Sequence, residues 1–168
     1  VGEYGLLSAG GSPVSGTAYF IIQDSNVVIW IATKGDGLIR AEATSPSGMS
    51  YKLTRYLHQE DDMYSLSDNN VYCVYEDHNG RIWAATFAGG INYLTENEDG
   101  KVLFINHRNH LKGYPIDPCY KARFITSDNN GRLWVGTTTG AVAFDENFEK
   151  PEDVQFYHFS RMPLDTQS

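Results

Sequence analysis

The stretch from Asn106 to Tyr120 contains side chains that could hold a polar ligand. Planar hydrogen-bond donors and aromatic rings bind sugars well, because they bond hydroxyl groups and cover the apolar face of a sugar ring. Binding residues also concentrate in loops that a rigid scaffold positions. The stretch therefore predicts a ligand-binding loop, with a plain solvated loop as the alternative. Its candidate residues are His107, Arg108, His110, Lys112 and Tyr114.

Other chemistry finds little support in the sequence. His107 and His110 would share a face only on a helix, and no third ligand lies near them, so we predict no metal site. Motifs such as GxSxG, HExxH and a phosphate-binding glycine loop are missing, so no catalytic residue and no cofactor are predicted. A carboxylate pair for glycoside hydrolysis stays open, since its members converge only in space. Cys73 and Cys119 are expected to be separate thiols.

An internal repeat organises the chain around its three tryptophans. Trp30, Trp83 and Trp134 are 53 and 51 residues apart, and each follows an aspartate by six positions. The repeated positions are expected to be structural, and the tryptophans are expected to fill the space between neighbouring sheets. They are Asp24, Trp30, Gly37, Asp77, Gly80, Trp83, Gly90, Asp128, Gly131, Trp134 and Gly140. Arg81 and Arg132, at matching positions, are expected to be solvated residues at the starts of strands.

Each copy contains a tight turn at its aspartate. In Asp77-His78-Asn79-Gly80 the carboxylate can accept backbone N–H groups, and Asn and Gly tolerate a positive φ. The first copy departs from this pattern, because Val27 stands where the other copies have glycine. A β-branched residue resists positive φ, so we predict that Asn26 takes the left-handed position there.

Between these turns the chain is expected to form short strands and no helix. Four strands in each of three copies predict an all-β fold of β-propeller blades, a partial propeller of three four-stranded antiparallel blades. We expect residues 1–16 to be a lead-in or the end of a preceding blade and residues 160–168 to begin a further connection. Between them lie blade 1 (17–56), a connection with blade 2 (57–106) and a connection with blade 3 (107–159). The fourth strand of the last copy is predicted at Val154–Phe159.

The segments Glu76–Trp83 and Ser127–Thr137 resemble two-component regulator propeller repeats, and Ser65–Val71 resembles the lead-in that opens a blade in that family. The resemblance covers about residues 17–159. Such repeats occur in the periplasmic region of Bacteroidetes hybrid two-component histidine kinases. The resemblance implies a periplasmic sensor segment that responds to oligosaccharides, regulates polysaccharide-utilisation genes and has no catalysis of its own. The alternatives are a propeller enzyme, such as a sialidase-like hydrolase or a lyase, and a pure protein-interaction propeller.

Charge and composition limit the partners. The net charge of −8 argues against nucleic-acid binding through this segment. No apolar run reaches the roughly 20 residues of a membrane span, so contact with a membrane is expected only through other parts of the protein. The chain starts at Val1, which favours an excised piece of a larger ectodomain. Three blades leave two apolar end faces, so we expect self-association, with a homodimer as one solution.

Overall fold

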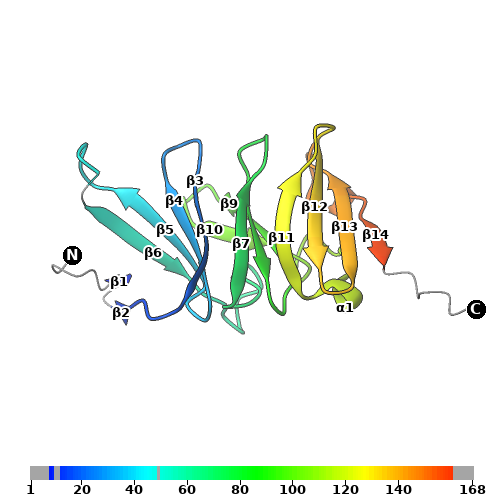
Figure 1. Ribbon diagram of the computed structural model, residues 1–168, viewed down its shortest axis with the longest axis horizontal. Coiled ribbons are helices and arrows are strands. Elements are labelled where there is room, and N and C mark those ends of the chain that lie inside the picture. Colours follow the sequence, from blue (N-terminus) through cyan, green and yellow to red (C-terminus); the bar gives the residue numbers. More distant parts are fainter. Residues whose placement is uncertain (1–7, 10–11, 49, 161–168) are drawn as a thin grey trace, which may run out of the picture.

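The computed structural model describes residues 8–9, 12–48 and 50–160, and within them three four-stranded antiparallel sheets follow one another in chain order (Figure 1). Blade 1 contains β3 (Ala18–Gln23), β4 (Ile29–Thr33), β5 (Leu38–Ala43) and β6 (Tyr51–Tyr56). Blade 2 contains β7 (Val71–Glu76), β8 (Ile82–Thr86), β9 (Ile91–Glu96) and β10 (Val102–Ile105). Blade 3 contains β11 (Ala122–Ser127), β12 (Arg132–Thr137), β13 (Gly140–Asp145) and β14 (Tyr157–Ser160). The all-β prediction of three propeller blades is confirmed.

The first strands of the three blades lie side by side, with β7 in contact with both β3 and β11 (Figure 1). From this row each sheet extends away through its remaining strands in sequence order. Residues on neighbouring blades therefore meet most closely along β3, β7 and β11.

Blade 2 is buried on both faces because its side chains alternate between two cores. The core toward blade 1 unites Trp30, Ala32 and Leu38 with Val74, Ile82, Ala84 and Phe104. The core toward blade 3 contains Cys73, Trp83, Ala85, Ile91 and Tyr93 from blade 2, and Ile125, Leu133, Val135, Val142 and Phe144 from blade 3. Every residue of β8 is buried as a result. This alternation explains why apolar residues run without interruption from Ile82 to Ala85 in β8.

The aspartate of each repeat connects its turn to the tryptophan of the next strand. The indole Nε1 of Trp30, Trp83 and Trp134 donates to the aspartate Oδ2 at 2.8, 2.9 and 2.9 Å. The other carboxylate oxygen accepts two backbone N–H groups of the turn, as the sequence predicted. The repeated spacing of six residues therefore reflects one hydrogen-bonded unit. Trp30 and Trp83 lie between sheets, whereas Trp134 is only partly buried and stacks on Phe159 at 5.5 Å.

The prediction for the turn of blade 1 is wrong. Val27 itself adopts positive φ, at 65°, where Gly80 and Gly131 have 77° and 76°. The reason is that Asp24 Oδ1 accepts the N–H groups of Asn26 and Val28, both at 2.9 Å, which imposes the same turn in all copies. The valine side chain is 65% exposed, so no packing compensates for the strained backbone.

Gly37 and Gly140 are required at the turns that follow the tryptophan strands. Both have positive φ, and a Cβ on either would lie 2.0 Å from a carbonyl oxygen of the adjacent strand. Both glycines are among the positions that the sequence pattern assigned to the blade structure.

Two short helical turns depart from the sequence prediction. α1 (Ile116–Cys119) lies in the connection before blade 3, and the 3-10 turn η1 (Pro151–Asp153) precedes β14. The chain is irregular between η1 and Phe156, so β14 begins at Tyr157 and not at Val154. Val154 instead packs into the core between blades 2 and 3. In the lead-in, β1 (Ser8–Ala9) pairs with β2 (Ser12–Pro13).

All three first strands carry a β-bulge at the same place. The pairing register shifts between Ala18 and Phe20, between Val71 and Cys73, and between Ala122 and Phe124. The extra residues are Tyr19, Tyr72 and Arg123. A bulge bends its strand and changes the direction of the inserted side chain.

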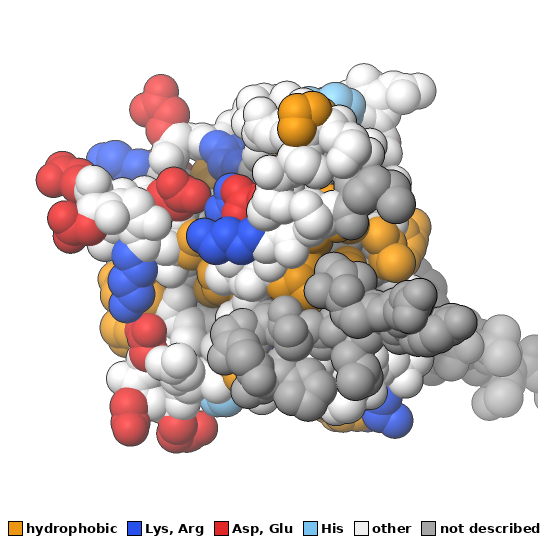
Figure 2. All heavy atoms as spheres, turned by 90° about the vertical axis from the view of Figure 1, so that its left-hand side faces the viewer, with side chains coloured by type: hydrophobic (Ala, Val, Ile, Leu, Met, Phe, Trp, Pro, Cys, Tyr) orange, Lys and Arg blue, Asp and Glu red, His pale blue; other side chains and the backbone are white. Residues whose placement is uncertain are grey.

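The outer blades expose apolar side chains. On blade 1 Ile21 is 59% exposed, and on blade 3 Tyr157 and Phe159 are 60% and 53% exposed. Figure 2 views the molecule from the blade 1 side, where hydrophobic side chains reach the surface and acidic side chains gather toward one edge. Self-association through these faces stays a prediction.

None of the helices in the described part of the chain is long and apolar enough to cross a bilayer.

Candidate functional site

The two irregular connections of the chain meet on one side of the blades. Residues 57–70 lead from blade 1 to blade 2, and residues 106–121 lead from blade 2 to blade 3. The side chain of Asn109 donates to Met63 O at 2.9 Å, and Arg108 Nη2 donates to Glu60 O at 3.3 Å. The connections thus hold each other in place, although the repeat assigns no structure to either.

A pocket of about 310 Å³ opens where these connections meet. We call it the connection pocket; its lining residues are Met63, Tyr64, Arg108, Asn109, His110, Lys112 and Glu152. The His110 imidazole bridges two of them, with Nδ1 2.5 Å from Glu152 Oε1 and Nε2 3.0 Å from the Tyr64 hydroxyl. The pKa of Glu152 is lowered by a hydrogen bond from its own backbone N–H and by the bond to His110. The pocket therefore offers a carboxylate, an imidazole and two cationic side chains within one small volume.

A second pocket of about 410 Å³ adjoins the first through Tyr64 and lies between β6 and β10. Lys101 of this pocket forms an ion pair with Asp62 at 3.7 Å, so blade 2 and the first connection are joined across it. The acidic stretch around Asp62 thus contributes to the wall of a pocket. Together the two pockets form one recess along the connections.

Three of the five candidate residues line the connection pocket: Arg108, His110 and Lys112. His107 is half-buried beside it, and burial, with a contribution from Arg108, lowers its pKa. Tyr114 does not belong to the site. Its ring is 3% exposed, and its hydroxyl donates to Cys119 O at 2.9 Å. Tyr114 is a core residue because the chain turns inward toward α1, which no periodicity in the sequence indicates.

Sequence reasoning missed Tyr64 and Glu152 as pocket residues. Tyr64 lies in the first connection, close to the acidic residues Glu60, Asp61 and Asp62. Glu152 comes from η1 in blade 3, 42 residues after His110, and the repeat gives no signal for it. Such residues meet only through the stacking of the blades.

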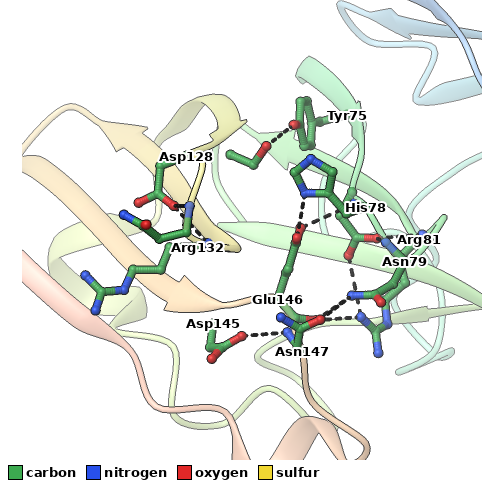
Figure 3. A network of polar contacts seen from close by, with 12 residues as sticks. Tyr75, His78, Asn79, Arg81, Asp128, Arg132, Asp145, Glu146 and Asn147 are labelled. Carbon is green, nitrogen blue, oxygen red and sulfur yellow. Dashed lines mark hydrogen bonds and ion pairs between the residues drawn. The ribbon is translucent and has the colours of Figure 1, made fainter.

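A separate polar cluster joins blades 2 and 3 at the turn ends of their sheets (Figure 3). In this inter-blade clamp the turn residues His78, Asn79 and Arg81 bind Glu146 and Phe148, which follow β13. His78 Nδ1 lies 2.6 Å from the buried Glu146 carboxylate, and Asn79 donates to Glu146 O at 3.1 Å. Arg81 donates to Glu146 O at 2.8 Å and to Phe148 O at 2.7 Å, with its guanidinium 4.1 Å from the Phe148 ring centre.

The prediction that Arg81 is solvated is therefore wrong, whereas Arg132 is exposed as predicted. The two arginines occupy equal positions in the repeat, but only Arg81 faces the chain that follows β13.

Cys73 and Cys119 are buried free thiols, as predicted, and burial raises the pKa of Cys73 to about 11. Among the residues that the structure describes, no three His, Cys, Asp or Glu side chains are grouped to hold a metal ion. The residues of the connection pocket can bind a ligand through hydrogen bonds and charge.

Comparison with known proteins identifies the repeat. Residues 65–88, from the lead-in through β8, match the two component regulator propeller family. The extracellular domain of BT4673 from B. thetaiotaomicron, described as a one component system, is 26% identical and superposes with a TM-score of 0.58. The match covers 81% of this chain and 17% of that one. A comparison with curated proteins finds no match.

Two further solved structures from B. thetaiotaomicron are extracellular domains described as hybrid two component systems. One is again BT4673 (23% identity, TM-score 0.54, 82% of this chain and 18% of that one). The other is BT3049 (21% identity, TM-score 0.64, 95% of this chain and 20% of that one). The chain thus spans about a fifth of the solved domains that it matches. It contains a two component regulator propeller repeat and shares the blade fold of these extracellular domains.

Proposed function

We propose that the chain is a segment of the periplasmic sensor domain of a hybrid two-component histidine kinase, and that this domain binds an oligosaccharide. The family match and the similarity to extracellular domains of a one component system and of hybrid two component systems support the sensor role. In this proposal the segment binds ligand or transmits its binding and carries out no reaction. The signal would be increased transcription of polysaccharide-utilisation genes.

The observation that carries the proposal is the connection pocket. The blades repeat the same scaffold, whereas the two connections differ in length and sequence and yet form one recess with Arg108, His110 and Lys112 on its wall. Variable polar loops on a rigid scaffold are the usual place for ligand recognition. For signalling, the oligosaccharide must bind two arrangements of the receptor with different affinity, because only a differential interaction shifts an equilibrium.

The test is calorimetric titration of the complete ectodomain with a panel of neutral and acidic oligosaccharides. Lys112→Ala should weaken binding of the recognised sugar about tenfold, the effect of losing one charge-assisted hydrogen bond. Lys52→Ala, an equally exposed lysine on β6, is the matched control and should leave binding unchanged. The proposal fails if no member of the panel binds, and the placement in the connection pocket fails if Lys112→Ala binds normally.

A further inference from the structure

The three bulge residues stack on one another across the blades. The rings of Tyr19 and Tyr72 have centroids 5.1 Å apart and planes at 27°, and the Arg123 guanidinium lies 4.7 Å from the centre of the Tyr72 ring. One residue from each blade therefore forms a continuous column at the start of β3, β7 and β11. Bulges are common beside binding sites, where they redirect a side chain.

The column continues into a wider surface. The Phe87 ring lies 5.9 Å from that of Tyr72, and Lys121 Nζ lies 4.9 Å from the centre of Phe87 and 5.5 Å from that of Tyr120. We call this surface the bulge strip; its residues are Tyr19, Tyr72, Phe87, Tyr120, Lys121 and Arg123. Tyr19 and Tyr120 are 40% and 41% exposed. Tyr19, Tyr72 and Arg123 of the strip belong to the first strands, which Figure 1 shows side by side. The strip shares no residue with the connection pocket.

The hydroxyls and charged nitrogens of the strip have no hydrogen-bond partner in the part of the chain that the structure describes. Within residues 12–48 and 50–160, the hydroxyls of Tyr19, Tyr72 and Tyr120 and the side-chain nitrogens of Lys121 and Arg123 form no hydrogen bond or ion pair with another residue. In contrast, the hydroxyls of Tyr64, Tyr75 and Tyr114 are all bonded. Arg40, Arg55 and Arg81 each pair with a carboxylate. Two cations of an acidic chain thus keep their donors available beside aromatic rings.

The strip also differs from a purely structural column. A residue that serves each blade equally would keep its type, as the tryptophans and turn aspartates do. The bulge positions instead contain Tyr, Tyr and Arg, so the third copy adds a positive charge where the others have a phenol. Arginine on an aromatic face keeps its N–H groups directed outward in the guanidinium plane, where they can bind an anion.

We propose that the bulge strip binds an acidic oligosaccharide, with its carboxylate or sulfate held by Arg123 and Lys121. The open ring faces of Tyr19 and Tyr120 cover apolar faces of the sugar, and the phenol hydroxyls bond sugar hydroxyls. This inference rests on the proposed function, because it takes an oligosaccharide as the ligand. It adds that this ligand is acidic and that the segment binds it at a second site.

The experiment measures binding of matched disaccharides to the complete ectodomain by calorimetry. Each set, built on galactose, glucose or mannose, contains a neutral disaccharide, the same disaccharide with one uronate residue and the same disaccharide with one sulfate ester. The double variant Arg123→Gln with Lys121→Gln should bind the acidic member at least tenfold more weakly and the neutral member unchanged. Arg132→Gln, an exposed arginine of blade 3, is the control and should bind as the parent does. The uronate and sulfate members show which anion is recognised.

Three results distinguish the proposals. Acidic disaccharides that bind the parent and the double variant equally would overturn the bulge strip as a site and leave the sensor proposal intact. Equal binding of neutral and acidic members to the parent would overturn the proposal that the ligand is acidic. Failure of every saccharide to bind the parent would overturn the proposed function and this inference with it. An unchanged unfolding midpoint shows that the double variant is folded.

Discussion

The interface between blades 1 and 2 and the interface between blades 2 and 3 have similar apolar interiors and different polar borders. At the first border, Ser25 contacts the Glu76 carboxylate through its backbone N–H and its hydroxyl. At the equivalent border of the second, the whole inter-blade clamp engages Glu146 and Phe148. The repeated apolar pattern therefore sets how blades stack, and residues outside the repeat set how firmly a given pair is joined.

The tryptophans show the same difference. Trp83 contacts Tyr93 of its own blade and Phe144 and Phe148 of blade 3, with ring centroids 4.9, 5.2 and 6.2 Å away. The aromatic neighbour of Trp30 is Tyr56 of its own blade, at 6.4 Å. The tryptophan at the second interface thus has more aromatic contacts than the one at the first.

The largest expected effect comes from removing the tryptophan of that interface. Trp83→Ala should lower the free energy of unfolding by about 3–5 kcal/mol, since it empties a fully buried site. Trp134→Ala, at the same repeat position but only partly buried, should cost about 1 kcal/mol. Chemical denaturation of both variants provides the measurement. Equal losses would mean that the burial of the tryptophan does not decide its contribution.

Removing the clamp should have a smaller effect. Arg81→Ala deletes two hydrogen bonds to carbonyl oxygens and a stacking contact, so we expect a loss of about 2 kcal/mol. Arg132→Ala removes an exposed arginine at the same repeat position and should change stability by less than about 0.5 kcal/mol. A difference of less than about 0.5 kcal/mol between the two variants would show that the contacts of Arg81 in the inter-blade clamp add no stability.

The turn of blade 1 should be improved by glycine. Val27→Gly relieves a β-branched residue at φ 65° and loses little packing, so it should raise the free energy of unfolding by about 1 kcal/mol. Gly80→Val at the equivalent turn, with φ 77°, should lower it by a similar or larger amount. Thermal unfolding of the two variants would contradict this if both midpoints moved in the same direction.

Thiol labelling should report local opening of the interface between blades 2 and 3. Cys73 and Cys119 are both buried in that core, and the pKa of Cys73 is raised to about 11, so few thiolates form near neutral pH. Iodoacetamide at pH 8 should label neither cysteine of the folded protein within the time that labels both in denaturant. Arg81→Ala should speed labelling of Cys73, whereas Arg132→Ala should not; mass spectrometry reads both.

The strands, turns and blades could be predicted because they depend on local and repeated signals. Asp77, Gly80 and Trp83 form one hydrogen-bonded unit within seven residues, and two further copies of the pattern removed the ambiguity that short strands usually have. Val27 shows the limit of residue preference. The carboxylate of Asp24 imposed a backbone that valine alone would avoid.

The candidate site could be predicted only in part. Arg108, His110 and Lys112 were found because their connection departs from the repeat, but the same argument included Tyr114, which is buried. Glu152 and the partners of Arg81 come from distant segments, and only the stacked blades bring them together. The bulges were not predictable either, since the inserted residue interrupts no pattern in the sequence.

The bulge shared by the three first strands also bears on how such an array can diversify after duplication. Tyr19, Tyr72 and Arg123 lie outside the two buried cores, so replacing one of them costs little stability while changing the chemistry displayed beside its neighbour. Each copy therefore contributes one residue that can differ in type at an equivalent position of the array. Blades of the same fold can in this way present different surface chemistry. New specificities can then arise by single substitutions that leave folding unchanged.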